Sequence, residues 1–507
     1  MHDIVNLGDI VRRDPAEHLE LSDVRDEART RRLSLADLRA QIQAVARGLL
    51  RRGCVAGDRI AVMSANRWEF LATYFGAMSA GMVAVPVNHR LPRETIAFIV
   101  ADAGACVALV DDGRDALLPD GFPRIRFDAD SQEHDSFAAL LDHGEFESVI
   151  PAPDACAEIL YTSGSTGRPK GVPLTHAGQL WALGKWHTGG DAPLGEKTLI
   201  VAPLYHMNGL FFASVAVSNG IAFTLMPRFD ARRYLQLAAT ERATLLSGIP
   251  TMFALMAREG DLVASLDLSS VRTVTIGSAP LTDALLDRVR ALFPNAVCQN
   301  GYGTTEAGPA VFGAHPDGRA RPSLALGVPY SDVGVRLAPA STPDVGVLQV
   351  RTPALTPGYL NLPDVTAERM VDGWYDTGDV MRRDADGFYY FVGRADDMFV
   401  CGGENVYPGE VERLLERCPG IAQAAVVPVP DEIKGMIPVA FVVRSAGSTL
   451  DEDTVKAFTL REGPAYAHPR IVIFRAEIPV ASTHKVDRTA LLNDALYRAA
   501  DAGRGAR

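Results

Sequence analysis

The sequence is poor in paired cysteines and in basic charge, and each shortage excludes a class of protein. None of its six cysteines forms a C-x-x-C pair. Each stands singly among apolar or small residues, which predicts scattered, buried thiols in a reducing compartment. Lysine and arginine number 50 against 62 acidic residues, for a net charge of −12. This balance disfavours nucleic acid as the main partner, but it leaves room for a local basic pocket that holds a nucleotide.

Long apolar runs are also missing, which bears on membranes and export. The longest apolar tract, residues 210–226, is interrupted by Ser218-Asn219-Gly220 and predicts two buried elements instead of a membrane span. Residues 1–13 contain no apolar core of the kind that a signal peptide needs. We therefore expect a cytoplasmic protein without an integral membrane segment. The sequence leaves the oligomeric state open, a homodimer included.

What the first part of the chain does contain is an alternation of helices and strands. The predicted helices are 34–53, 68–79 and 93–103, and the predicted strands are 59–63, 82–87 and 106–110. Ser34 is a good N-cap for the first helix. Residues 111–150 are polar and predict a variable connection. Strands that alternate with helices at this spacing indicate a parallel sheet.

The pattern changes twice further along the chain. Short apolar runs between residues 199 and 299 alternate with helical segments and predict a second α/β layer, whereas residues 327–391 predict a small β-rich subdomain. A chain of 507 residues has room for about three or four folded units. We predict an α/β fold with a large N-terminal domain, residues 1–394, made of two α/β subdomains and the β-rich one. A small α+β domain, residues 395–507, completes it.

The stretch around which the chain is organised is Tyr161–Gly171, which reads Y-T-S-G-S-T-G-R-P-K-G. Its glycines let backbone N–H groups converge on one point, its hydroxyl residues add donors, and Lys170 adds positive charge. These properties suit a loop that wraps a polyphosphate, and the alternative is a Ser/Gly-rich surface linker. The loop is not a Walker A loop, because Lys170 follows a proline and precedes Gly171.

A second glycine-rich segment, residues 300–306, reads N-G-Y-G-T-T-E and follows a predicted strand. Glycines on both sides of Tyr302 are expected to leave its ring free of neighbouring side chains, as stacking on a base needs. Glu306 offers a hard oxygen ligand suited to Mg²⁺. Taken alone, the segment is also compatible with a glycine-rich turn that contains an incidental tyrosine.

These two segments resemble the adenylate-forming superfamily, which includes acyl-CoA and aryl-CoA ligases, peptide-synthetase adenylation domains and firefly luciferases. Residues 162–170 match the family's phosphate loop in full, and residues 301–306 match its G-Y-G-x-T-E motif at every fixed position. The resemblance implies that Tyr302 stacks on adenine and that Thr305 contacts the α-phosphate. Glu306 and Thr162 would bind Mg²⁺.

Further segments follow in the family's order. Residues 277–281 resemble its adenine-edge segment. Two further motifs follow each other at the family's spacing: residues 374–379 read W-Y-D-T-G-D, and residues 393–397 read G-R-A-D-D. An Asp after a Gly is ordinarily a turn residue. The resemblance implies instead that Asp379 accepts both ribose hydroxyls, that Arg394 holds the nucleotide side and that Asp396 is a hinge. The nucleotide-binding residues implied in this way are Thr162, Ser163, Gly164, Ser165, Thr166, Gly167, Lys170, Ser278, Ala279, Asn300, Gly301, Tyr302, Gly303, Thr304, Asp379 and Arg394.

Two motifs near the C-terminus resemble those of the CoA ligases. Residues 401–412 share the string G-G-E-N with aryl-CoA ligases, which implies that Gly402, Gly403 and Glu404 bind CoA. A plain loop before a helix start is the alternative. Residues 479–488 read P-V-A-S-T-H-K-V-D-R, against a family pattern of P-x-T-x-x-G-K-x-x-R. Lys485 maps to the catalytic lysine that bridges the carboxylate and the α-phosphate, and a surface lysine is the alternative.

The lysine motif departs from the family pattern at two positions, and the candidate site also includes a histidine. Ala481 stands where Thr is usual and His484 where Gly is usual, which bears on the geometry of the lysine loop. A lone histidine in an apolar stretch, such as His206, is commonly a packed core residue. The family has an aromatic residue or a histidine here that gates the carboxylate, so we expect His206 among the catalytic residues. Trp186, Met207 and Gly209 are expected to line the acid pocket.

The sequence as a whole predicts an ATP-dependent acyl-CoA ligase that uses Mg²⁺ and CoA. The carboxylate attacks the ATP α-phosphate to give an acyl-adenylate and pyrophosphate, and CoA thiolate then displaces AMP. The resemblance implies that the C-terminal domain rotates between these steps. The acid is predicted to be aromatic or of short or medium chain length.

Two alternatives belong to other functional classes. One is an adenylation enzyme that loads an amino acid or an aryl acid onto a carrier protein. Residues 204–212 contain no Asp to hold an α-ammonium group, and no carrier domain is recognised in the chain. The other is a binding protein that has lost catalysis, which the presence of Lys485 and Glu306 disfavours.

Overall fold

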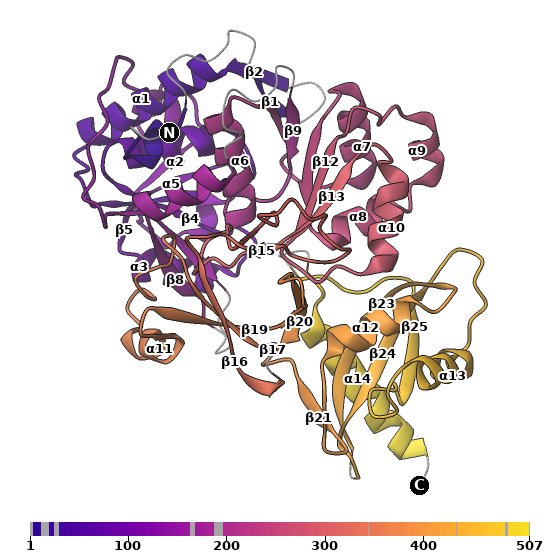
Figure 1. Ribbon diagram of the computed structural model, residues 1–507. Helices are drawn as coiled ribbons and strands as arrows, with labels where there is room; N and C mark the ends of the chain where they lie inside the picture. The colour runs from indigo at the N-terminus through magenta and orange to yellow at the C-terminus, as the bar shows by residue number, and fades with distance from the viewer. Residues whose placement is uncertain are drawn as a thin grey trace.

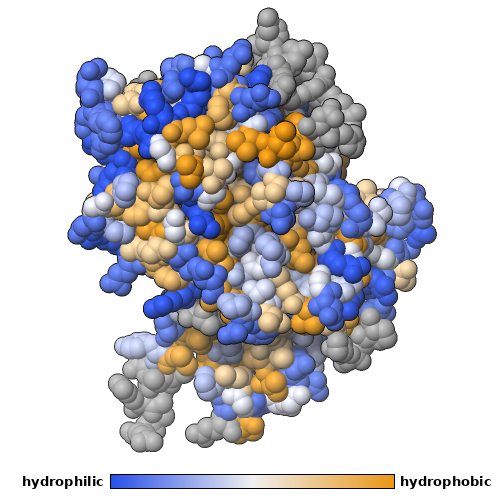
Figure 2. Space-filling view, turned by 90° about the vertical axis from the view of Figure 1, so that its left-hand side faces the viewer, coloured by the Kyte–Doolittle hydropathy of each residue, from blue (hydrophilic) through white to orange (hydrophobic). Residues whose placement is uncertain are grey.

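The computed structural model describes residues 4–11, 20–24, 30–162, 168–186, 196–342, 344–431, 433–481 and 485–505. Figure 1 shows a large N-terminal region of helices and sheets, with a smaller C-terminal region below it. The space-filling view in Figure 2 shows a face on which hydrophilic side chains separate several apolar areas. No helix in the described part of the chain combines the length and the apolar character that crossing a membrane requires.

The first sheet is parallel except at one edge. Its strands follow the order β6-β5-β3-β4-β7-β8, and β8 runs antiparallel to β7. The strands are β3 Arg59–Met63, β4 Val83–Pro86, β5 Ala105–Val110, β6 Arg124–Arg126, β7 Cys156–Thr162 and β8 Lys170–Thr175. The helices of this part are α1 Leu35–Arg51, α2 Trp68–Ser79, α3 Arg93–Asp102, α4 Phe137–Leu140 and α5 His176–Lys185, with 3₁₀ turns η1 Leu7–Asp9 and η2 Asp115–Leu117.

The second sheet repeats this plan. Its order is β13-β12-β11-β9-β10-β1-β2, parallel from β13 to β1 and antiparallel between β1 and β2. The strands are β1 Glu20–Val24, β2 Thr30–Ser34, β9 Lys197–Ile200, β10 Ala222–Leu225, β11 Leu245–Gly248, β12 Thr273–Gly277 and β13 Val297–Gly301. The helices are α6 Met207–Asn219, α7 Ala231–Thr240, α8 Pro250–Met256, α9 Gly260–Ser265 and α10 Asp283–Leu292.

One hydrophobic core joins these two sheets. It contains residues from β3, β7 and β8 of the first sheet, from β1 and β10 of the second, and from helices α1, α2, α5 and α6. Every residue of α2 is buried, so this helix is enclosed by protein on all sides. Helix α1 instead faces solvent on one side and begins with a capping box, in which Ser34 and Asp37 each accept a backbone N–H from the other.

The β-rich subdomain and the C-terminal domain follow. The subdomain contains β14 Phe312–Gly313, β15 Val328–Pro329, β16 Gly334–Thr342, β17 Val345–Arg351, α11 Pro363–Arg369, β18 Met370–Val371, β19 Trp374–Arg383 and β20 Tyr389–Arg394. The C-terminal domain contains β21 Phe399–Cys401, β22 Glu404–Val406, α12 Pro408–Glu416, β23 Ile421–Asp431, β24 Gly435–Arg444, α13 Glu452–Glu462, β25 Ile471–Arg475 and α14 Arg488–Gly505. Strand β20 pairs with β19, whereas β21 pairs with β22 and β24 in a separate sheet.

The fold class predicted from the sequence is confirmed, and one detail is corrected. Residues 111–150, predicted as a variable connection, contain β6, which extends the first sheet, and α4, which covers part of its core. The prediction of buried thiols is wrong for Cys106, which is exposed. Cys106 lies at the start of β5, where it has no partner in β3, and the strand becomes buried only from Ala108 onward.

Candidate active site

A large cavity lies where the N-terminal and C-terminal regions meet. It encloses about 1230 Å³ and is lined by residues of both regions. The predicted site residues that line it are Thr162, Lys170, Ser278, Ala279, Asn300, Gly301, Tyr302, Gly303, Thr304, Glu306, Asp379, Arg394, Asp396 and Lys485. Side chains that are far apart in the sequence are thus gathered around one space large enough for a nucleotide and a small acid.

The carboxylate of Asp379 is held from two sides. The hydroxyl of Tyr302 donates to Oδ2 of Asp379 at 2.6 Å, and Nη1 of Arg394 donates to Oδ1 at 2.8 Å. Below it, the backbone N–H of Asp379 donates to Oγ1 of Thr377, whose hydroxyl donates to the carbonyl of Leu348. Burial raises the pKa of Asp379, while Arg394 and Tyr302 oppose that shift. The acid is therefore fixed in direction and still has lone pairs to offer.

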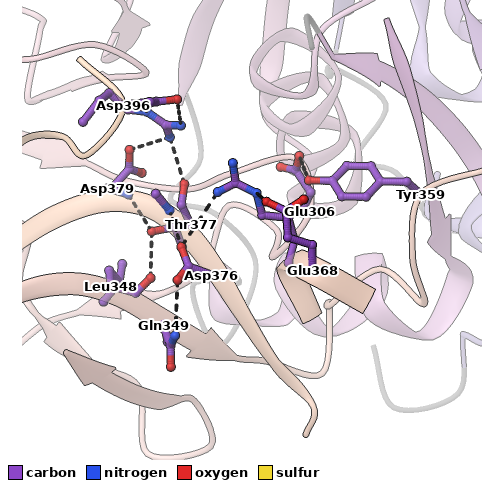
Figure 3. A network of polar contacts seen from close by, with 12 residues as sticks. Glu306, Leu348, Gln349, Tyr359, Glu368, Asp376, Thr377, Asp379 and Asp396 are labelled. Atoms are coloured by element: carbon purple, nitrogen blue, oxygen red, sulfur yellow. Dashed lines mark hydrogen bonds and ion pairs between the residues drawn. The ribbon is translucent and has the colours of Figure 1, made fainter. Parts of the chain in front are cut away.

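Arg394 links this acid to the proposed hinge. Its Nε and Nη2 donate to the two oxygens of Asp396 at 2.9 and 3.0 Å, a bidentate ion pair, while Nη1 also donates to the carbonyl of Thr377. Figure 3 shows the carboxylates of Asp379 and Asp396 turned toward a common guanidinium group. In this arrangement Asp396 belongs to the same hydrogen-bonded network as the predicted ribose-binding acid.

The prediction that the ring of Tyr302 stands free of other side chains is wrong. The ring of Phe312 lies 5.7 Å from it, centroid to centroid, at an angle of 56°. The hydroxyl is engaged by Asp379, and burial together with that carboxylate raises the pKa of Tyr302 well above its usual range. The flanking glycines leave room for a ligand, but they do not leave the tyrosine unsupported.

Glu306 is held by Tyr359, a residue that the sequence analysis did not select. The Tyr359 hydroxyl donates to Oε1 of the buried Glu306 at 2.9 Å, and Figure 3 shows the two side chains facing each other. Nζ of Lys170 lies 5.2 Å from the centroid of the Tyr359 ring, so the end of the phosphate loop meets the same tyrosine. A tyrosine within P-G-Y-L carries no chemical signal by itself, which is why sequence reasoning missed it.

The donors around Glu306 suit a hard divalent cation. Among the described residues, no hydrogen bond engages Oε2 of Glu306, and the hydroxyl-bearing Thr162 lines the same cavity. Carboxylate and hydroxyl oxygens are ligands that Mg²⁺ accepts. Thr162 is the last residue of β7 and pairs with Lys170, the first residue of β8. The five residues between these strands that were predicted to wrap phosphate, Ser163, Gly164, Ser165, Thr166 and Gly167, lie outside the described residues.

Lys485 enters the cavity from a narrow hairpin of the C-terminal domain. The backbone N–H of Ala481 donates to the carbonyl of Lys485 at 2.7 Å, and Val480 pairs with Val486. Ala481 closes this hairpin through its backbone, so the replacement of the usual Thr leaves the closing bond in place. His484 lies outside the described residues. The Lys485 residue is exposed at the cavity, and partial desolvation by the surrounding protein lowers the pKa of Lys485, against the opposing influence of Asp379.

Polar contacts between the two regions accompany this placement of Lys485. The Thr282 hydroxyl donates to Oε2 of Glu416 at 2.6 Å, and Nη2 of Arg288 donates to the carbonyl of Ala422 at 3.0 Å. Both donors come from the second sheet's helical layer, and both acceptors from the C-terminal domain. The C-terminal domain is thus attached in the pose that presents its lysine to the cavity.

The residues predicted for the acid pocket do not line this cavity: Trp186 follows the end of α5, and Met207 and Gly209 lie in the first turn of α6. Trp186 packs edge-on against Phe211 and Phe212, with ring centroids 5.8 and 5.5 Å away. Met207 and His206 are half-buried, and the His206 ring lies 4.8 Å from that of Tyr205.

Two more residues belong to this neighbourhood. Gly209 lies where a Cβ would come within 2.5 Å of the backbone oxygens of Ala202 and Pro203, so a larger residue would push α6 away. Asn208, which sequence reasoning missed, connects the residues predicted for the acid pocket to one predicted to bind the nucleotide. Its Nδ2 donates to Oγ of Ser278 at 3.0 Å, and Ser278 has a φ of 65°, a conformation that is rare outside glycine. Backbone strain of this kind is often found at functional sites.

Thr305 and the predicted CoA residues are not brought into the cavity in this structure. Thr305 is half-buried beside it, while the neighbouring Thr304 accepts the backbone N–H of Ala307 and so caps the turn. Gly402 and Gly403 form the tip of the β21–β22 hairpin, with φ values of 61° and 91°. A two-residue hairpin turn with both φ angles positive requires glycine-like residues. Glu404 follows on β22 and is exposed.

Comparison with known proteins settles the family. The sequence model described as AMP-binding enzyme matches residues 10–360, and that of the AMP-binding enzyme C-terminal domain matches residues 410–485. The chain belongs to the AMP-binding enzyme family. A feruloyl-CoA synthase of Amycolatopsis sp is 34% identical over 471 residues, which cover 90% of this chain and 92% of that protein. A 4-coumarate–CoA ligase of Solanum tuberosum is 33% identical, covering 91% of this chain and 89% of that protein.

Solved structures of this family share the same architecture. The ATP-bound MatB of Rhodopseudomonas palustris superposes with a TM-score of 0.84 at 28% identity, covering 97% of this chain and 98% of that protein. The agreement extends over both regions, so this AMP-binding enzyme has the family's large N-terminal domain and its small C-terminal domain.

Proposed function

We propose that this enzyme activates an aromatic carboxylic acid with ATP and transfers the acyl group to CoA. The reaction class is that of an AMP-forming acyl-CoA synthetase, as in the relatives that match over nine-tenths of the chain. The observation that carries the proposal is the shared cavity, which is lined by Lys485 from one domain and by Tyr302, Glu306 and Asp379 from the other. A lysine opposite a metal-binding carboxylate suits the neutralisation of a reacting phosphate.

Each wall of the cavity has a proposed part in the first half-reaction. Tyr302 stacks on adenine, Asp379 accepts the ribose hydroxyls and Arg394 supports that acid from behind. Residues 162–170 wrap the phosphates, Lys170 adds charge at the end of that loop, and Ser278 to Ala279 and Asn300 to Thr304 border the base. The support for these roles is that Thr162 and Lys170 of the loop line one space together with Ser278, Ala279, Asp379, Arg394 and residues 300–304.

Lys485 and the metal are proposed to carry the chemistry at the α-phosphate. Thr305, which is half-buried beside the cavity in this pose, is proposed to contact that phosphate. Lys485 bridges the acid carboxylate and the phosphate, so the charge that builds up during attack is neutralised. Glu306 and Thr162 are proposed to hold Mg²⁺, which lowers the charge on the departing pyrophosphate when bound. Tyr359 keeps Glu306 oriented toward the cavity by its hydrogen bond.

The acid is proposed to be a flat aromatic one. Trp186 packs edge-to-face against Phe211 and Phe212, and Met207 belongs to the same hydrophobic cluster as Trp186 and Phe211. Edge-to-face packing extends readily to another ring. Gly209 lets the first turn of α6 pack closely against the backbone of Ala202 and Pro203. His206 is proposed to gate the carboxylate of the acid substrate. The relatives named for feruloyl and 4-coumaryl substrates support this class of acid.

The second half-reaction needs the C-terminal domain in another pose. We propose that residues 395–507 rotate about Asp396 relative to residues 1–394 and bring Gly402, Gly403 and Glu404 to the CoA thiol. The change of sheet between Arg394 and Phe399 supports a boundary there. We also place the reaction in the cytoplasm, where ATP and CoA are both present. A native mass measurement decides between a monomer and a homodimer.

The test is a pyrophosphate-release assay with a panel of acids, followed by detection of the CoA thioester. We expect ferulate, 4-coumarate or benzoate to turn over at least ~10-fold faster, by kcat/KM, than octanoate, since the loss of stacking and shape matching costs roughly 1–3 kcal/mol. Release of pyrophosphate without any CoA thioester would contradict the ligase assignment. Preference for octanoate would contradict only the aromatic substrate.

A further inference from the structure

Two cysteines and an aspartate that are unrelated to the proposed catalysis come together at the surface of the first sheet. Sγ of Cys54, Sγ of Cys106 and a carboxylate oxygen of Asp58 all lie within 4.8 Å of one another. We propose that Cys54, Asp58 and Cys106 bind one thiophilic divalent cation of the zinc class, with water as a fourth ligand. Two thiolates and a carboxylate form a donor set that zinc accepts, and a tetrahedral site places such donors roughly 3.6–3.8 Å apart.

Two of these ligands sit on a turn that the backbone holds in place. Cys54 and Asp58 each follow a glycine with a φ of 88°, and these glycines bound the turn between α1 and β3. The carboxylate of Asp58 accepts the backbone N–H of Val55 at 2.8 Å, which orients it toward the interior of the turn. The backbone of Asp58 is in turn paired with Val55 and Val83. The backbone of the turn and the Asp58 carboxylate are therefore held in place before a metal binds.

The third ligand is placed by an irregularity in the sheet. Along the parallel pair of β3 and β5, Arg59 faces Ala105 and Ile60 faces Val107, so Cys106 is an extra residue without a partner in β3. Bulges of this kind are rare in parallel pairs, and they redirect a side chain. The Cys106 thiol is consequently turned to the carbonyl of Arg59 and toward the turn that carries Cys54. In a strand without this irregularity, the Cys106 thiol would not point toward the turn.

The local charges favour a cation. Among the described residues, no ion pair engages Asp58, although Arg52 lies in the same turn. The guanidinium of Arg52 is occupied by the carbonyl of His134. The site therefore retains the negative charge of its aspartate and offers two sulfur donors at an accessible position.

The position in the sheet assigns the site a structural role. Strands β3 and β5 begin beside the cluster, whereas the parallel strand β7 ends at Thr162 and leads into the phosphate loop. The cluster thus lies at the amino edge of the sheet, and the nucleotide cavity at the carboxyl edge. A metal there would tie the α1–β3 turn to β5 and stabilise the folded state by its binding free energy, without entering the reaction.

The test is a Co²⁺ titration of the reduced, metal-stripped full-length enzyme. We expect one equivalent to produce sulfur-to-cobalt charge-transfer absorption, and Zn²⁺ to displace it. Because the band reports sulfur ligands, binding of Co²⁺ near Glu306 does not produce it. Cys54→Ser and Cys106→Ser should each abolish the band, Asp58→Asn should weaken Co²⁺ binding at least 10-fold, and the matched controls Cys156→Ser and Cys298→Ser should leave it unchanged.

A second measurement uses the wild-type chain alone. Saturating Zn²⁺ should protect Cys54 and Cys106 from alkylation by iodoacetamide at least 10-fold, read by mass spectrometry, while Cys298 reacts at an unchanged rate. The proposal is overturned if the reduced enzyme gives no thiolate band, or if the band survives in Cys54→Ser. Formation of a Cys54–Cys106 disulfide by an enzyme that binds no Co²⁺ would likewise overturn it and identify a redox pair.

Discussion

The phenolic oxygen of Tyr302 lies 2.6 Å from Oδ2 of Asp379, so the residue proposed to stack on adenine also orients the residue proposed to hold the ribose. One side chain therefore connects recognition of the base to recognition of the sugar. Arg394 completes the arrangement by binding the other oxygen of Asp379 at 2.8 Å.

Tyr302→Phe should separate the two parts of this relationship. The ring remains, but Asp379 loses one partner, so we expect the KM for ATP to rise about 5-fold, which corresponds to roughly 1 kcal/mol for one hydrogen bond. Tyr302→Leu removes the ring as well and should raise the KM for ATP further. Steady-state kinetics at saturating acid measure both. An equal KM in the wild type and the Phe variant would show that the hydroxyl does not act through Asp379.

Lys485→Ala should act on one half-reaction. If Lys485 bridges carboxylate and α-phosphate, adenylation slows by at least ~10²-fold, the scale of losing one preorganised charge. Thioester formation from supplied acyl-adenylate should fall far less. Lys456→Ala is the matched control, because Lys456 lies in the same domain and pairs with Glu452 on the surface of α13. Parallel loss in both half-reactions would remove the bridging role.

Gly403→Ile should block the second half-reaction. The side chain would obstruct a thiol arm at the hairpin tip, so the adenylate accumulates while little thioester forms. Gly403 also has a φ of 91°, and backbone strain alone would affect folding. Gly447→Ile is the control, since Gly447 has a φ of 75° in the same domain and equally open surroundings. Normal CoA turnover in Gly403→Ile would mean that the glycines serve only the turn.

Asp396→Pro should hold the C-terminal domain in the adenylating pose. Proline fixes φ near −65° and restricts the preceding residue, so a junction that must rotate loses its freedom. We expect pyrophosphate release in a single turnover with little CoA thioester. Asp396→Ala is the control, because it breaks the ion pair with Arg394 and leaves the backbone free. A folded proline variant in which both rates drop equally, checked by a thermal melt, would exclude this hinge.

Glu158→Gln should change how stability depends on pH. Burial raises the pKa of Glu158 to about 7, and the carboxyl is hydrogen-bonded to the Tyr74 hydroxyl. Because the folded pKa exceeds that of the unfolded chain, the folded state binds more protons between pH 4.5 and 7, and stability falls as the pH rises through this range. At pH 8 the Gln variant should be more stable by roughly 2–3 kcal/mol.

The measurement for Glu158 is chemical denaturation at pH 5 and at pH 8. At pH 5 the variant and the wild type should differ little, because the carboxyl is protonated in the folded enzyme. Glu145→Gln, which changes an exposed acid, should leave the pH dependence as it is. A Gln variant that is less stable than the wild type at pH 8 would show that the carboxylate is accommodated in charged form.

The sequence predicts best those elements whose bounds follow from a continuous buried segment. The helix at 68–79 and the strand at 59–63 agree with the structure at both ends. The helix is buried along its whole length, and every strand residue after Arg59 is buried. The strands β1 and β2 were not anticipated, since they join the second sheet through partners far along the chain. The hydrophobic periodicity of a short segment does not indicate which distant strand it pairs with.

The candidate site follows the same rule. Residues in motifs with dense polar chemistry, such as Tyr302 and Asp379, were selected from the sequence and line the cavity. Tyr359 and Asn208 were missed because their roles depend on neighbours that only folding provides. The pairing of Cys54 with Cys106 arises from a strand irregularity, and spacing along the chain gave no sign of it.

Lys485 and the Gly402–Gly403 hairpin belong to one domain, yet only the lysine reaches the cavity in this pose. If Lys485 serves adenylation and the hairpin serves CoA binding, a domain that moves as a rigid body can place only one of them at the cavity at a time. Adenylation and thiol transfer are then mutually exclusive in any single molecule, and pyrophosphate must form before CoA can be acylated. Each catalytic cycle would include two reorientations, so turnover can never exceed the rate at which the domain alternates, however fast the chemistry becomes.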